Sequence, residues 1–161
     1  MKKQKGFSLI ELLIVVAIIL IIAAIAIPNL LRSKMAANES SAVGSLRSIN
    51  TAEVAYATAY PNIGYSPDLA SLGGVAPCNA LPGGACLIDD TLAKSDTQAK
   101  SGYLNVFGGV TAQGGINVTY TLLGKPANRG TTGQRAFFTD QSGVIRYNST
   151  ADATVTDSPI Q

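Results

Sequence analysis

The sequence has 161 residues, enough for one long helix and one modest domain, and its 12 basic and 10 acidic side chains give a formal charge of +2. Three of those lysines stand in the first five residues, and the remaining chain has no dense Lys/Arg cluster, which excludes an ordinary nucleic-acid-binding surface. The chain has no histidine, which excludes Ser-His and Cys-His catalysis, and the composition predicts no enzyme, no cofactor and no metal site.

The chain opens with a basic head that is followed by a long apolar run. Residues 1–6 contain three lysines, and the 21 residues from Phe7 to Ile27 contain a single charge, Glu11. At 1.5 Å per residue the run is about 30 Å long, which matches the hydrocarbon thickness of a bilayer. The pattern predicts a membrane-crossing helix, with the lysine-rich head in the cytoplasm and the rest of the chain facing the periplasm or the outside.

Glu11 is the unusual residue of this helix. Placing a carboxylate at that depth in a membrane costs about 2.5–3.5 kcal/mol, so Glu11 needs a partner or a protonated state. No Lys or Arg lies within the run to pair with it. A cut between Gly6 and Phe7 would create a positive α-amino group one helical turn before Glu11. That amine could pair with the acid within the chain or in a neighbouring copy.

The segment GFSLIE, residues 6–11, between a lysine-rich head and a long apolar helix, resembles the N-terminus of type IV pilins and of the pseudopilins of type II secretion. The resemblance implies that a prepilin peptidase cuts after Gly6 and methylates Phe7, and that Glu11 sets the register of one subunit against the next. It also implies a single-pass inner-membrane precursor, a homopolymer formed through the N-terminal helix, and a pilus assembly machinery as partner.

Three other kinds of segment share the order of basic head and apolar run. Ala24-Ile25-Ala26 satisfies the small-x-small rule of a secretory signal, but the run exceeds the usual 7–15 residues and Glu11 would be unexplained. A simple single-pass anchor would likewise lack the acid. A lipoprotein is excluded, because no cysteine lies near the junction.

Residues 28–60 are predicted to continue the helix. Pro28 cannot donate a hydrogen bond to the carbonyl four residues earlier and should kink the helix rather than end it. Beyond it, apolar residues at spacings of three and four form one stripe, whereas Ser45 and other polar residues lie opposite and should face water. The stripe consists of Val43, Leu46, Ile49, Ala52, Tyr56 and Tyr60.

Residues 61–102 are predicted to be rich in loops. Pro61 ends the helix, and Ser66 as a cap with Gly73 as an end predicts one short helix. Three acids in the loop, Asp89, Asp90 and Asp96, lack the spacing of a calcium loop and are interpreted as a solvated face.

The two cysteines of the chain lie in the same loop region. Cys78 and Cys86 are separated by seven residues that include a proline and two glycines. In a chain exported to an oxidising compartment, this spacing favours a disulfide over two free thiols, and it would pin a surface loop.

Residues 103–147 are predicted to form an antiparallel sheet, because alternating segments follow one another with glycine-rich turns that include Gly108 and Gly109. The expected strands are 103–107, 116–122, 135–139 and 144–147. The tail, 148–161, is small and polar and should be flexible. The fold class is therefore α+β, a long N-terminal helix with a membrane half and an amphipathic half, packed against a small sheet of about four strands, as the pilin resemblance also implies.

The sequence favours a structural subunit of a type IV pilus, which polymerises into an extracellular filament. The alternative is a pseudopilin in a short periplasmic pseudopilus. Major pseudopilins resemble one another in an acidic calcium-binding loop near the C-terminus, and this chain offers only Asp140, Asp152 and Asp157 there. A third class, an anchored binding module that never polymerises, would keep residues 1–6.

Overall fold

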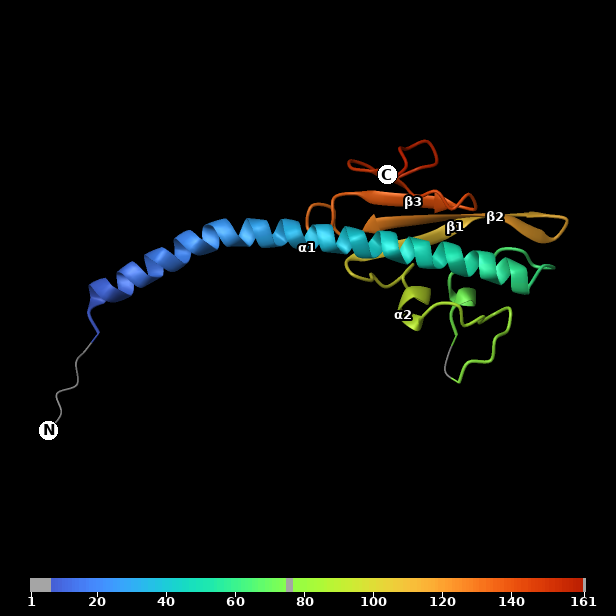
Figure 1. The fold of residues 1–161 in the computed structure, drawn as a ribbon, viewed down its shortest axis with the longest axis horizontal. Coiled ribbons are helices and arrows are strands. Elements are labelled where there is room, and N and C mark those ends of the chain that lie inside the picture. The colour runs from blue at the N-terminus through green and yellow to red at the C-terminus, as the bar shows by residue number, and fades with distance from the viewer. Residues whose placement is uncertain (1–6, 75–76, 161) are drawn as a thin grey trace. The chain divides into compact units, whose positions relative to one another are not determined.

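The computed structural model describes residues 7–74 and 77–160 and divides into two compact units, Met1–Lys34 and Met35–Gln161 (Figure 1). Its longest element is the helix α1, Leu9–Ala59, which continues through Pro28. The expected kink at Pro28 stays a prediction. The other elements, in chain order, are the 3-10 helix η1 (Ala70–Leu72), α2 (Asp90–Ala93), β1 (Tyr103–Gln113), β2 (Ile116–Pro126), β3 (Ala136–Asp140) and β4 (Arg146–Asn148).

The second unit contains one antiparallel sheet in the order β1-β2-β3-β4. Leu123 of β2 lies opposite Val106 of β1 on one side and opposite Phe138 of β3 on the other. Neighbouring strands follow one another along the chain, so each pair needs only a short connection. The predicted four-stranded antiparallel sheet is therefore confirmed.

The first two strands are longer than predicted. β1 and β2 each have 11 residues, and Gly108 and Gly109, which were expected in a turn, lie inside β1. Gly109 has φ +60°, and a Cβ at that position would approach the side chain of Thr121 to 2.5 Å. The register shifts between Gly108 and Thr111, so these glycines form a bulge within the strand.

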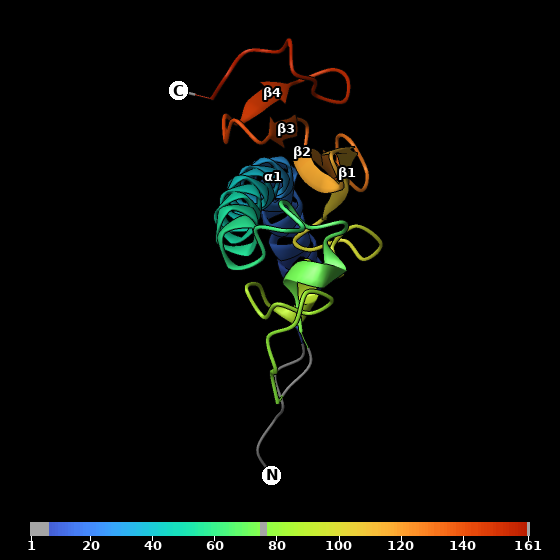
Figure 2. The same cartoon turned by 90° about the vertical axis from the view of Figure 1, so that its right-hand side faces the viewer.

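The part of α1 that follows Met35 packs against the sheet with its apolar stripe. Leu46, Ile49 and Tyr56 are completely buried. They belong to one core cluster with residues of the sheet, among them Tyr103, Leu122 and Phe137. Viewed along α1, the sheet lies on one side of the helix and the loop region with α2 on another (Figure 2). The predicted stripe is therefore confirmed as the helix face that carries the core.

Ser45 departs from the predicted pattern. It was expected to face water, yet it is buried. Its hydroxyl donates to the carbonyl of Ser41 at 3.0 Å and accepts a hydrogen bond from Lys100 Nζ at 3.1 Å. Because both bonds satisfy the hydroxyl, the chain before β1 can cover it without leaving an unpaired polar group.

Glu39 joins α1 to the segment that leads into β3. Its carboxylate accepts hydrogen bonds from the backbone N–H of Gln134 at 2.9 Å, the backbone N–H of Arg135 at 3.0 Å and Arg135 Nε at 2.8 Å. Burial alone would raise the pKa of Glu39, but these bonds and the Arg135 charge outweigh it and lower the pKa below its ordinary value. Glu39 is therefore a charged attachment point between the helix and the sheet.

Glu53 is a second buried acid on α1, and it has no exposed surface. Its carboxyl group accepts hydrogen bonds from the backbone N–H of Ser66, at 2.9 Å, and from the Ser66 hydroxyl. Burial raises the pKa of Glu53, and the two bonds from Ser66 offset only part of that rise. Ser66 was expected to cap a short helix, and instead it holds the chain after α1 against the helix.

Replacing Glu53 with glutamine is expected to change the pH dependence of stability. Because the folded-state pKa is raised, the stability contributed by Glu53 is full below its ordinary pKa of 4.5 and is lost as the pH rises through the folded value. Glutamine does not titrate, so the unfolding free energy of Glu53→Gln should rise relative to the unchanged protein between pH 4 and pH 7. Urea unfolding of the full chain in detergent at both pH values measures this, and parallel pH curves would contradict it.

The two helices of the loop region are short, and an aspartate side chain accepts hydrogen bonds near the start of each. Asp68 accepts hydrogen bonds from the backbone N–H and the hydroxyl of Ser71, and η1 ends at Gly73 as predicted. The helix was expected to start near Ser66 but starts later, because Asp68 provides the local acceptor. Asp89 caps α2 by accepting from the backbone N–H of Leu92 at 2.8 Å, a helix that the sequence did not predict.

The C-terminal tail runs back along β4. The backbone N–H of Tyr147 donates to the carbonyl of Ser158 at 3.0 Å, and that of Ile160 donates to the carbonyl of Ile145 at 2.8 Å. Ala153 is buried. The flexibility expected for residues 148–161 stays a prediction, and slow hydrogen exchange of the Tyr147 and Ile160 amides would count against it.

Candidate functional site at the N-terminal helix

The first unit exposes an unusually apolar helix surface. Between Phe7 and Leu31 the large apolar side chains are exposed, Phe7 to 78% and Leu30 to 71%. Among the described residues, α1 is long and apolar enough to cross a membrane, a property that a signal sequence near an N-terminus shares. Soluble monomers rarely expose so large a contiguous apolar surface, so this helix needs lipid or other protein around it.

Glu11 makes a local contact at the start of this helix. α1 begins at Leu9, and the Glu11 carboxylate accepts a hydrogen bond from the backbone N–H of Ser8 at 2.9 Å. This is one half of a capping box, in which the third helical residue reaches back to the residue that precedes the helix. The pattern Ser8-x-x-Glu11 is the sequence signal for this contact, and the reading of Glu11 as an unpaired acid missed it.

The remaining residues of the predicted processing motif flank this cap. Phe7 lies before the first residue of α1 and is exposed, whereas Gly6 lies outside the described residues. The roles expected for Gly6 and Phe7 in cleavage and methylation stay predictions. The structure adds that Phe7 and Ser8 precede the helix, so a new amine at Phe7 would lie next to the capping contact.

The predicted disulfide is confirmed. Cys78 and Cys86 are joined, with their Cα atoms 6.3 Å apart. A Cβ at Gly74 would approach both sulfur atoms to less than 3 Å, so only glycine fits against the bridge there. The Tyr56 hydroxyl donates to the carbonyl of Pro82 at 2.7 Å, which ties the closed loop to the end of α1.

Removing the disulfide is expected to lower the unfolding free energy by about 2.5 kcal/mol, the entropy of closing a short loop in the unfolded chain. Replacement of both Cys78 and Cys86 with alanine should give the same loss as reduction. Denaturant unfolding with and without reductant measures this for the unchanged chain. A double variant as stable as the oxidised protein would contradict the account.

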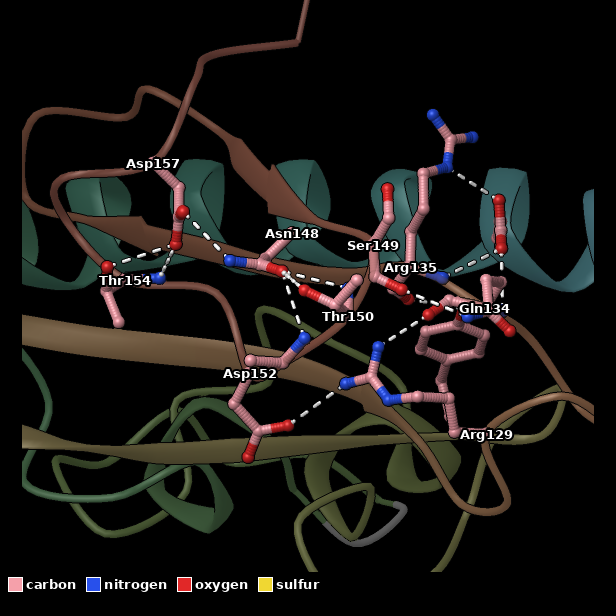
Figure 3. Close-up of polar contacts among 12 residues, drawn as sticks. Arg129, Gln134, Arg135, Asn148, Ser149, Thr150, Asp152, Thr154 and Asp157 are labelled. Atoms are coloured by element: carbon pink, nitrogen blue, oxygen red, sulfur yellow. Dashed lines mark hydrogen bonds and ion pairs between the residues drawn. The ribbon is translucent and has the colours of Figure 1, made fainter.

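The acids near the C-terminus are each bonded to separate protein groups (Figure 3). Asp152 pairs with Arg129 at 3.4 Å, and Asp157 accepts from the Asn148 side chain at 3.0 Å and from Thr154. Within residues 7–74 and 77–160, no group of three or more His, Cys, Asp or Glu side chains could hold a metal. Asp157 and Asn148 thus close a loop by hydrogen bonds alone.

The acids of the loop region also have local contacts. Asp90 pairs with Lys94 at 2.7 Å across one turn of α2, with both side chains exposed, and Asp89 caps the same helix. Asp96 is exposed. This arrangement agrees with a solvated face, and such an exposed pair contributes little to stability.

Comparison with known proteins places the similarity in short segments. The family described as the prokaryotic N-terminal methylation motif matches residues 1–27. The type IV wide pilus major component PilA4 of Thermus thermophilus is 60% identical over 40 residues, 25% of this chain and 30% of that protein. The type IV major pilin protein PilA of Myxococcus xanthus is 46% identical over 54 residues, 34% of this chain and 24% of that protein. No solved structure matches the chain significantly.

These matches agree with the geometry at the start of α1. The methylation motif covers Phe7, the capping contact of Glu11 and the exposed apolar residues up to Ile27. The matched segments span less than a third of each of the two relatives, so the similarity that they show is limited to those segments. The chain thus carries the prokaryotic N-terminal methylation motif, and its predicted resemblance to the type IV pilin family is confirmed over those segments.

Proposed function

We propose that the chain is a structural, non-enzymatic subunit of a type IV pilus. The observation that carries the proposal is the exposed apolar half of α1 with its single acid, within a segment that matches the methylation motif. The similarity to two proteins named as type IV pilus components supports the same role. An apolar helix of this kind is buried in the membrane before assembly and among identical helices afterwards.

The precursor lies in the inner membrane as a single-pass protein with residues 1–6 in the cytoplasm. Prepilin peptidase removes these residues after Gly6 and methylates the amine of Phe7. The capping contact of Glu11 with Ser8 supports a role for this acid at the new terminus, since it holds the carboxylate one residue from Phe7. The pilus assembly machinery then moves the subunit from the membrane into the growing fibre.

Within the fibre, the apolar helices pack together and the Phe7 amine of one subunit pairs with Glu11 of the next. A buried charge is tolerated only when it is paired and hydrogen-bonded, so the pairing fixes the axial register. A repeated contact of this type does not close on itself and produces a helical filament. The second unit, Met35–Gln161, would then form the outer surface of the fibre.

The alternative of a pseudopilus subunit is less well supported. Both similar proteins are named as type IV pilus components. Asp140 accepts from the backbone N–H of Ser142, and Asp152 and Asp157 have the separate partners described above, so they do not converge as calcium ligands.

Shearing fibres from cells that express the chain, and identifying their protein by mass spectrometry, tests the proposal. The expected result is that this chain is a main component of long surface fibres. Cells with a chromosomal deletion of the gene are the control and should lose those fibres. Detection of the chain only in periplasmic or membrane fractions, with fibres unchanged in the deletion strain, would contradict the proposal.

A further inference from the structure

Arg135 is held in a fixed orientation on the surface of the second unit. Its Nε donates to Glu39, its backbone carbonyl accepts from the Tyr103 hydroxyl at 2.7 Å, and its guanidinium carbon lies 5.5 Å from the ring centre of Phe137 and 5.7 Å from that of Tyr147. An arginine held in this way loses little conformational entropy when it binds a ligand.

The rest of the guanidinium group is free to bind. The Arg135 side chain is 43% exposed, and its two terminal nitrogens make no hydrogen bond to any residue that the structure describes. Figure 3 shows these two nitrogens pointing away from the other residues drawn. The paired N–H groups of a guanidinium match the two oxygens of a carboxylate.

Arg135 lines two hollows that share Ile160. One is bounded by Tyr147 and the tail residues Ser158 and Pro159, and the other lies along α1 beside Gly44 and Arg47. A Cβ at Gly44 would meet no atom within 4 Å, so the second hollow is open above the helix. It therefore has space for a small ligand next to two arginines.

The charge of the hollow along α1 selects the class of ligand. Arg47 and Arg135 are both positive, and Glu39 is the one acid among the residues that line it. Glu39 is already engaged by three donors from Gln134 and Arg135. The lining therefore has a net charge of +1, and the neighbouring Phe137 and Ile160 are apolar. This combination fits a planar anion with one negative charge that is attached to an apolar group.

We propose that Arg135 and Arg47 form a carboxylate-binding site on the folded domain. The carboxylate belongs either to an acidic side chain of a second copy of this chain or to a soluble acid. All residues of the site lie in the second unit, so the binding of acetate to it does not depend on the proposed polymerisation.

The test is a titration of the full chain in detergent micelles with sodium acetate, and separately with sodium chloride and inorganic phosphate at equal ionic strength. The backbone amide signals of Gly44 and Ile160 report on binding. Acetate alone is expected to shift these amide signals in a saturable way. Arg135→Lys keeps the positive charge but lacks the paired N–H groups of a guanidinium, so it should weaken acetate binding about tenfold. Arg47→Gln should weaken it less, and Arg129→Lys is the matched control that should leave it unchanged.

Equal, unsaturated shifts with acetate and chloride would overturn the proposal, as would saturation by phosphate but not acetate. Arg135→Lys could disturb the contact with Glu39. Arg47→Gln changes an exposed residue instead, and its effect on acetate binding therefore tests the site independently. If Arg47→Gln also lowers the fibre yield of cells, the carboxylate comes from a second copy. An unchanged fibre yield together with weakened acetate binding assigns it to a soluble acid.

Discussion

Replacing Glu11 with alanine is expected to leave leader cleavage largely intact and to remove most fibres from the cell surface. Removing one partner of a buried ion pair costs about 3–5 kcal/mol, because the other charge stays buried without compensation. In the proposed fibre that charge is the Phe7 amine, and the cost recurs at every subunit contact. Electron microscopy of the cells counts the fibres, and mass spectrometry of the membrane fraction reports the extent of cleavage.

Two further variants separate the charge of Glu11 from its capping contact. Glu11→Gln keeps an oxygen that can accept from the Ser8 N–H, as the carboxylate does at 2.9 Å, but it removes the charge. We expect it to lose fibres as Glu11→Ala does. Asp96→Asn removes the same charge from an exposed loop residue and should assemble normally. Normal fibres with Glu11→Gln would show that charge pairing does not drive assembly.

Replacing Glu39 with alanine is expected to lower the unfolding free energy by about 3 kcal/mol or more. Glu39 is 7% exposed as a residue, and its carboxylate accepts from two backbone N–H groups and from Arg135 Nε. In Glu39→Ala, the backbone N–H groups of Gln134 and Arg135 and the Arg135 guanidinium lose their acceptor while they stay partly buried. Denaturant unfolding of the full chain in detergent measures the loss. Ser40→Ala, one position along the same helix on an exposed residue, should change stability by less than about 0.5 kcal/mol.

The effect of Glu39 should depend on pH. Because the pKa of Glu39 is lowered in the folded protein, its stabilisation is present above its ordinary pKa of 4.5 and is lost as the pH falls through the folded value. The difference between the unchanged chain and Glu39→Ala should therefore shrink from pH 7 towards pH 3. A difference that stays constant over this range would show that packing, and not the charge, accounts for the loss.

The elements that depend on simple periodicity could be predicted from the sequence. The stripe through Leu46, Ile49 and Tyr56 predicted the buried face of α1, and the alternating segments predicted four antiparallel strands. The short spacing of Cys78 and Cys86 predicted the disulfide. Each of these signals is local, so no knowledge of distant contacts was needed.

The polar contacts between distant segments could not be predicted in the same way. Glu39 and Glu53 appear as ordinary charged residues of an amphipathic helix, and their burial depends on partners at Arg135 and Ser66. Gly109 looked like part of a turn, because the bulge depends on the register of β1 against β2. Hydrogen bonds between distant segments and the register of strands depend on tertiary packing, which the local sequence pattern does not encode.

The capping contact of Glu11 is an intermediate case. Its signal, Ser8 followed by an acid three residues later, is present in the sequence. The cost of placing a carboxylate in a membrane predicted a protonated state or a partner, and the Phe7 amine was the partner expected. The structure adds a local partner, so Glu11 has an acceptor role in the isolated subunit as well as the proposed role in the fibre.

The intact mass of the mature protein shows whether the chain is cleaved after Gly6 and methylated. Purified from cells, the chain should lack residues 1–6, begin at Phe7 and carry one additional methyl group, with Glu11 four residues from its new amine. Peptide fragmentation locates the methyl group on the Phe7 nitrogen. A protein that still begins at Met1, or one that begins after Ala26 and is released into the medium, would contradict the account.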